Sequence, residues 1–90
     1  ALRQQVSEGA KSIIEQEFAA YIVDKAAEMG LNCTARVSCR AEENGLYLPD
    51  RTEVAGPLSQ EERGRLSQLI QEELGVPADR QAYYSGEELP

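Results

Sequence analysis

The chain has 90 residues, with nine Lys and Arg against sixteen Asp and Glu, for a formal net charge of −7. A chain of this length forms one small domain that buries about two thirds of its unfolded surface. Its negative field repels phosphate backbones, and no segment approaches the ~20 apolar residues of a membrane-spanning helix, so the sequence argues against nucleic acid as a partner and against membrane insertion by this segment.

The first third of the sequence has the pattern of one long helix. Apolar residues recur at spacings of three and four up to Met29, which predicts an amphipathic helix from about residue 2 to 29. Gly30 follows, where a left-handed residue commonly ends a helix. No capping residue precedes Leu2, so we expect this single domain, residues 1–90, to be a fragment of a longer protein.

The next segment has the pattern of a β-hairpin. The apolar period changes to two from Leu31 to Glu42, which predicts a half-buried strand. Asn44-Gly45 predicts a two-residue turn, because both turn residues must tolerate positive φ, and a second strand begins at Leu46. The two strands are therefore predicted to be antiparallel neighbours.

A two-residue turn fixes the pairing of these strands. On the buried face it sets Ala41, Val37 and Ala35 opposite Leu48, Thr52 and Val54, and on the other face it sets Arg36 opposite Glu53. It also sets Asp50 opposite Cys39 on the apolar face, which conflicts with burial, and Pro49 cannot donate to a ladder. We therefore expect an edge strand with a bulge near Pro49 and Asp50.

The remaining sequence predicts a second helix and a short third strand. Ser59 and Glu62 have the spacing of a capping box, and Gly75 ends a helix that runs from about 60 to 74. Residues 80–84 are β-compatible, without a clear apolar side, and residues 85–90 are expected to be a frayed tail. The predicted fold class is α/β, as an α+β two-layer domain in the order α-β-β-α-β, with two helices packed on one face of a three-stranded sheet.

No constellation of residues predicts catalysis or ligand binding. The chain has no His and no Cys-x-x-Cys motif, so neither a zinc site nor the commonest base for a nucleophilic Cys is expected. Cys33 and Cys39 lie on one strand face about 20 Å apart, too far to bridge, and are interpreted as small buried residues. The sequence predicts no enzyme, no metal, no cofactor and no small-molecule substrate.

The sheet face that the helices leave uncovered is the one candidate site. Basic residues collect there, in a chain that is acidic elsewhere. The predicted face consists of Thr34, Arg36, Ser38, Arg40, Tyr47, Arg51 and Glu53. Such a face is either simply solvated or an interface that meets the acidic helix face of a neighbouring copy, because opposite charges set orientation and register. Repetition of that contact would close a ring or build a filament.

The element order and two local stretches resemble the C-terminal domain of the stage III sporulation protein AF family of endospore-forming bacteria. The stretches are Ile13-Ile14 and Tyr21-Ile22 ahead of Gly30, and Leu58-Ser59 through Glu72-Glu73-Leu74-Gly75-Val76-Pro77. The resemblance implies a soluble domain behind a membrane anchor, similar to the ring-building motif of secretion systems, in a channel complex between mother cell and forespore. The Pro49-Asp50 segment departs from a regular pair of strands.

Two functions from different classes follow. The first is a non-enzymatic assembly domain of a membrane-associated sporulation channel, whose partners are other protein subunits or further copies of itself. The second is a small binding or regulatory module with a KH-like αββα arrangement, not bound to a membrane. The second lacks the Gly-x-x-Gly loop and the basic surface that RNA binding needs.

Overall fold

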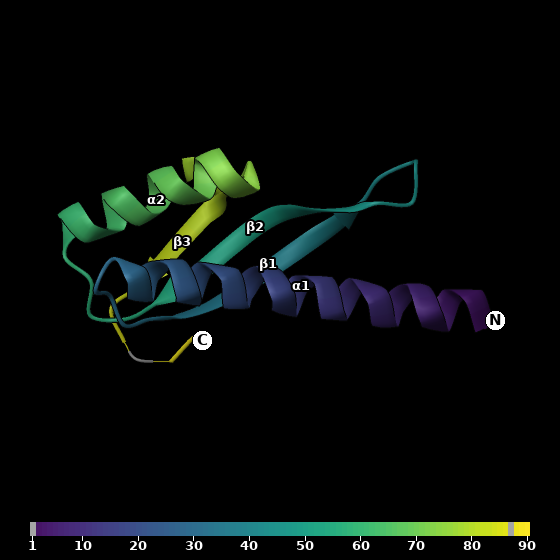
Figure 1. Ribbon diagram of the computed structural model, residues 1–90, viewed down its shortest axis with the longest axis horizontal. Helices are drawn as coiled ribbons and strands as arrows, with labels where there is room; N and C mark the ends of the chain where they lie inside the picture. Colours follow the sequence, from purple (N-terminus) through teal and green to yellow (C-terminus); the bar gives the residue numbers. More distant parts are fainter. Residues whose placement is uncertain (1, 87) are drawn as a thin grey trace.

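A computed structural model describes residues 2–86 and 88–90 (Figure 1). The elements are α1 (Leu2–Glu28), β1 (Thr34–Ala41), β2 (Tyr47–Ala55), α2 (Gln60–Leu74), a 3-10 turn η1 (Ala78–Arg80) and β3 (Gln81–Tyr84). The sheet order is β1-β2-β3, with β2 antiparallel to β1 and parallel to β3. The predicted α+β fold in the order α-β-β-α-β, with both helices packed on one face of the sheet, is confirmed.

Both helices end as the glycines predict. After α1, Gly30 has a φ of 80°, the Leu31 N–H donates to the Ala26 carbonyl at 2.8 Å, and the Gly30 N–H donates to that of Ala27 at 3.0 Å. This pair of bonds is a Schellman motif. At α2, Ser59 and Glu62 form the predicted capping box and Gly75 is left-handed. These local signals place α1 and α2 relative to the strands that follow them.

The hairpin loop has three residues, so the prediction of a two-residue turn is wrong. The Glu42 N–H donates to the Leu46 carbonyl at 2.8 Å, and the Gly45 N–H donates to the Glu42 carbonyl at 3.0 Å. Gly45 alone has a positive φ, and Asn44 instead accepts the Leu46 N–H through its side-chain oxygen at 3.1 Å. Because the Asn44 side chain satisfies a loop N–H, the chain turns through a tight turn followed by one left-handed glycine.

The predicted bulge is confirmed at Asp50. Ser38 pairs with Arg51 and Cys39 pairs with Pro49, so Asp50 is the extra residue of β2. The three-residue loop displaces the pairing by one residue, and the bulge restores it. The predicted pairs on the side of the bulge away from the loop are therefore correct, including Val37 with Thr52. Between the bulge and the loop, Ala41 pairs with Tyr47 and not with Leu48.

This displacement corrects the predicted position of Tyr47. Its partner Ala41 lies on the same side of β1 as Val37 and Cys39, which are buried, and Tyr47 itself packs against the hydrophobic core. Tyr47 therefore does not belong to the uncovered face. The cause is the extra loop residue, because a shift of one residue turns every side chain to the other side of the sheet.

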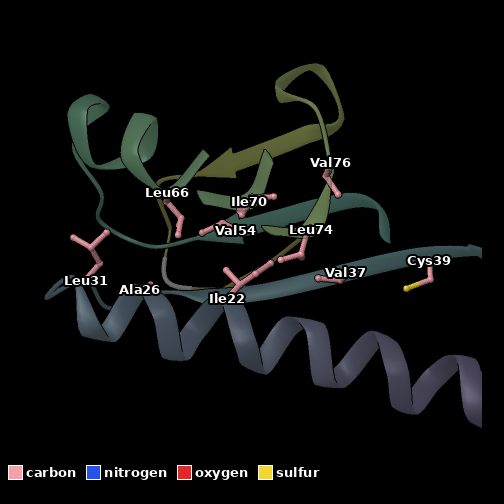
Figure 2. Close-up of a cluster of buried hydrophobic side chains, with 10 residues drawn as sticks. All are labelled: Ile22, Ala26, Leu31, Val37, Cys39, Val54, Leu66, Ile70, Leu74 and Val76. Carbon is pink, nitrogen blue, oxygen red and sulfur yellow. The ribbon is translucent and has the colours of Figure 1, made fainter. Parts of the chain in front are cut away.

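The core lies between the helices and one face of the sheet (Figure 2). Ile22 and Ala26 of α1 and Leu66 and Ile70 of α2 are fully buried. The cluster also contains Leu31, Val37, Cys39, Val54, Leu74 and Val76. Side chains from both helices and two strands thus meet in one cluster, so loss of any element exposes the others.

Three polar side chains of the sheet, those of Thr52, Gln81 and Tyr83, also face this core. The Gln81 amide donates to the carbonyls of Val76 at 2.9 Å and Ser67 at 3.2 Å, and Tyr83 donates to its oxygen at 2.6 Å. These bonds tie β3 to the end of α2, and burial raises the pKa of Tyr83 to about 12. The hydroxyl of Thr52, by contrast, is buried with no hydrogen-bond partner among the described residues. An unmet buried hydroxyl costs about 1–3 kcal/mol.

Candidate interaction surface

Six of the seven predicted residues lie together on the sheet face opposite the helices. Strand pairing sets Arg36 beside Glu53 and Ser38 beside Arg51, with Thr34 and Arg40 at either end of the row. Leu48 takes the place predicted for Tyr47, because it pairs with Arg40. The open face is hereafter the surface formed by Thr34, Arg36, Ser38, Arg40, Leu48, Arg51 and Glu53.

Leu48 is the residue of this surface that the sequence did not reveal. It is 38% exposed, and Leu46 in the adjoining loop is 58% exposed. The period-two pattern of β2 assigned Leu48 to the core under a two-residue turn. Leu48 is exposed because the loop has three residues. The sequence would have placed Leu48 on the open face only if a three-residue loop had been predicted in place of a two-residue turn.

Carboxylates on the same surface partly neutralise the arginines. Arg36 lies 3.5 Å from Glu53, and Arg40 lies 3.3 Å from Asp50 and 3.4 Å from Glu42. Arg51 is exposed and has no ion pair among the residues that the structure describes. Exposed pairs of this kind contribute little stability and rearrange at small cost. The open face therefore offers arginines that a partner's carboxylates can engage.

Asp50 connects the bulge of β2 to Arg80, which directly precedes β3. Its carboxylate accepts from Arg80 Nη2 at 2.5 Å, and its carbonyl accepts from Arg80 Nε at 2.8 Å. Arg40 Nη1 donates to the other carboxylate oxygen at 3.3 Å. The hydrogen bond from Arg80 is the main cause that lowers the pKa of the Asp50 carboxyl below its ordinary value of 3.8. Because of the bulge, the Asp50 carboxylate does not point into the core and instead accepts hydrogen bonds from two arginines.

We expect Asp50→Asn to lower the free energy of unfolding at neutral pH, by an amount that decreases as the pH falls. Because the folded pKa lies below 3.8, the carboxylate contributes fully above that pH and loses its contribution as the pH falls through the folded value. Urea midpoints of the two proteins should therefore differ above pH 3.8 and converge well below it. Asp24→Asn, on the exposed side of α1, is the matched control. An Asp50→Asn difference that persists unchanged in strong acid would contradict this role.

The last residues of the sequence return to the open face. Arg36 Nη2 donates to the carbonyl oxygen of Pro90 at 3.3 Å, and Leu89 is half-buried. The Tyr84 hydroxyl donates to Glu53 at 3.4 Å, on the same surface. Ala55 is fully buried although strand alternation directs it to this side. One end of the open face is therefore covered, while the end with Leu48 is exposed.

The opposite side of the molecule carries the acidic helices. Their exposed carboxylates are those of Glu17, Asp24, Glu28, Glu61, Glu72 and Glu73. A groove of about 280 Å³ runs between α1 and the end of α2, with Phe18 and Leu74 in its wall and Glu17 and Glu73 at its sides. Tyr21 donates a hydrogen bond to Glu73 across the groove, which raises the pKa of Tyr21. The two sides of the domain thus differ in charge.

Cys39 is buried and Cys33 is half-buried. Both are free thiols, and burial raises the pKa of each; at Cys39 the neighbouring Glu15 carboxylate adds to this effect. Glu15 also accepts the Cys39 backbone N–H at 2.7 Å, which holds α1 against β1. A raised pKa disfavours the thiolate that nucleophilic chemistry needs. Among the described residues, no group of three His, Cys, Asp or Glu side chains is placed to hold a metal ion.

Two further observations bear on the chain as a whole. Within the part of the chain that the structure describes, neither helix combines the length and apolar character needed to cross a bilayer. Comparison with protein families, with curated proteins and with solved structures gives no match. The function is therefore inferred from the geometry and charge of the two sides of this domain.

Proposed function

We propose that this chain is a non-enzymatic assembly domain that acts through protein-protein contacts. The observation that carries the proposal is the unequal charge of its two sides. A sheet face that neither helix covers, with Arg36, Arg40 and Arg51, lies opposite a helical layer that carries at least six exposed carboxylates. Charge complementarity of this kind sets the orientation and register of a contact.

The proposed contact joins the open face of one copy to the helical layer of the next. Because the two surfaces differ, the contact is heterologous, and its repetition closes a ring or extends a filament. Exposed Leu48 at the end of the open face supplies the apolar contact that charges alone do not. The resemblance noted above supports placing this assembly in a membrane-associated sporulation channel, with an anchor outside these 90 residues.

Charge reversal tests the proposed contact. We expect Arg36→Glu combined with Arg40→Glu, introduced into the intact protein of an endospore-forming host, to abolish its assembly and its function in the cell. The new carboxylates would face the acidic helices of the neighbour, and like charges across an interface cost several kcal/mol. The measurement is the size of the complex recovered from the membrane fraction, together with spore yield.

A compensating variant serves as the control. Glu61→Arg combined with Glu72→Arg, added to the sheet-face variant, restores the net charge and makes the helical layer basic, so it should restore assembly. Normal assembly of the sheet-face variant would contradict the proposed contact. Recovery of the intact protein entirely outside the membrane fraction would contradict the channel assignment but not the contact itself.

A further inference from the structure

The contacts around Arg36 indicate what the open face recognises. Its guanidinium donates to a carboxylate, that of Glu53 at 3.5 Å, and to a main-chain carbonyl, that of Pro90 at 3.3 Å. The residues Glu88–Pro90, hereafter the tail, follow β3 in the sequence, and Figure 1 shows the C-terminus beyond the end of that strand. We propose that the open face around Arg36 is a docking site for acidic peptide segments, and that the tail is such a ligand held in cis.

The chemistry of the tail matches that of the site. Glu88 carries a negative charge, Leu89 is half-buried, and the Pro90 carbonyl accepts from Arg36. The site contains Arg36, whose side chain is 51% exposed. It also contains the exposed Arg51, which lies on the neighbouring strand and pairs with Ser38. A guanidinium presents five donors, so Arg36 has capacity beyond the two bonds that it makes here.

The chain is also held at the end of β3, before the tail begins. Arg63 of α2 donates to the Ser85 hydroxyl at 3.1 Å, directly after β3. The Gly56 N–H donates to the Tyr84 carbonyl at 3.0 Å, which fixes the point where the tail leaves the sheet. A segment held at its root samples the site at a high effective concentration, in the millimolar range for short linkers.

The inference goes beyond the proposed function because it needs no second copy. It also has a consequence for that function, since both the tail and the helices of a neighbour would use Arg36. A ligand held in cis must leave before another can bind, and it lowers the apparent affinity by the fraction of time that it occupies the site. The tail thus sets how available the open face is.

A titration tests the site directly. The chain is shortened to end at Gly86, and a synthetic peptide with the sequence of residues 85–90 is added at a concentration where the chain is monomeric. Nuclear magnetic resonance follows the side-chain N–H of Arg36 and the backbone N–H groups of β1. We expect removal of the tail to shift these signals, and saturating peptide to return them to their positions in the full chain.

Three variants make the titration decisive. Arg36→Ala in the shortened chain should weaken peptide binding by about fivefold or more, as loss of a charge-assisted hydrogen bond implies. Arg65→Ala, on the far side of the molecule, should leave binding unchanged. In the full chain, Arg36→Ala should shift the backbone signals of Leu89 and Glu88, which reports on the tail without any truncation.

Two results would overturn the inference. One is a shortened chain whose Arg36 signals coincide with those of the full chain. The other is peptide binding that Arg36→Ala leaves as strong as before. Because the titration uses monomeric protein, its failure leaves the charge-reversal result in cells unaffected, and a failed charge reversal leaves the titration intact.

Discussion

Replacing Ile70 by alanine should lower the free energy of unfolding by about 2–5 kcal/mol. Ile70 is 0% exposed and belongs to the hydrophobic cluster in which side chains of both helices meet those of the sheet (Figure 2). Its truncation removes buried methyl and methylene groups and leaves a cavity that the surrounding side chains fill only in part. Small domains have a total stability of about 5–15 kcal/mol, so this single change removes a large share of it.

Chemical denaturation monitored by circular dichroism measures this loss. Gln68→Ala, on the exposed side of the same helix, is the matched control and should change stability by less than about 0.5 kcal/mol. Equal effects of the two substitutions would show that α2 does not pack on the sheet through Ile70.

The second large effect concerns two glycines that respond to alanine with opposite signs. At Gly56 an added Cβ would lie 2.7 Å from the backbone oxygen of Asn32 and 3.1 Å from Cys33 Cβ. A backbone oxygen between two elements cannot move aside like a side-chain end, so we expect Gly56→Ala to cost about 1–3 kcal/mol. At Gly64, inside α2, an added Cβ meets nothing within 4 Å. Gly64→Ala should therefore stabilise the chain by about 1 kcal/mol, because alanine favours the helix.

The pair of glycine variants contains its own control, since both add one methyl group. Thermal and urea unfolding of the two proteins, measured side by side, should move in opposite directions. A stabilising Gly56→Ala would mean that the loop after β2 does not approach Asn32 as closely as the structure shows.

Much of the fold could be predicted because its signals are local. The capping box at Ser59 and the glycines at positions 30 and 75 each specify a helix end through the backbone groups that they satisfy. The bulge was predicted from a conflict, since a regular ladder would have placed the Asp50 carboxylate beside Cys39. The energy of burying a charge is large enough to decide such a case from the sequence alone.

The parts that were missed depend on choices that local patterns do not decide. Asn44-Gly45 suits both a two-residue and a three-residue loop, and the Asn44 side-chain bond to Leu46 that accompanies the longer loop is not visible in the sequence pattern. The partner of Asp50, Arg80, lies 30 residues away in the chain, beyond any periodic signal. The contact between the tail and Arg36 is made by a main-chain carbonyl. Every residue has this group, so the sequence does not indicate the contact. Most of the candidate surface was nevertheless predictable, because strand alternation alone places six of its seven residues.

The loop and the bulge of the hairpin have a joint consequence. A regular hairpin with a two-residue turn and the observed hairpin with a three-residue loop and a bulge use the same number of residues between Val37 and Thr52. The two arrangements therefore differ only in the pairing at the end of the hairpin, and the rest of the sheet is paired in the same way in both. In one register Leu48 reaches the open face, and in the other Tyr47 does. The identity of residue 50 acts as the selector, because only a side chain that belongs outside the core favours the register seen here.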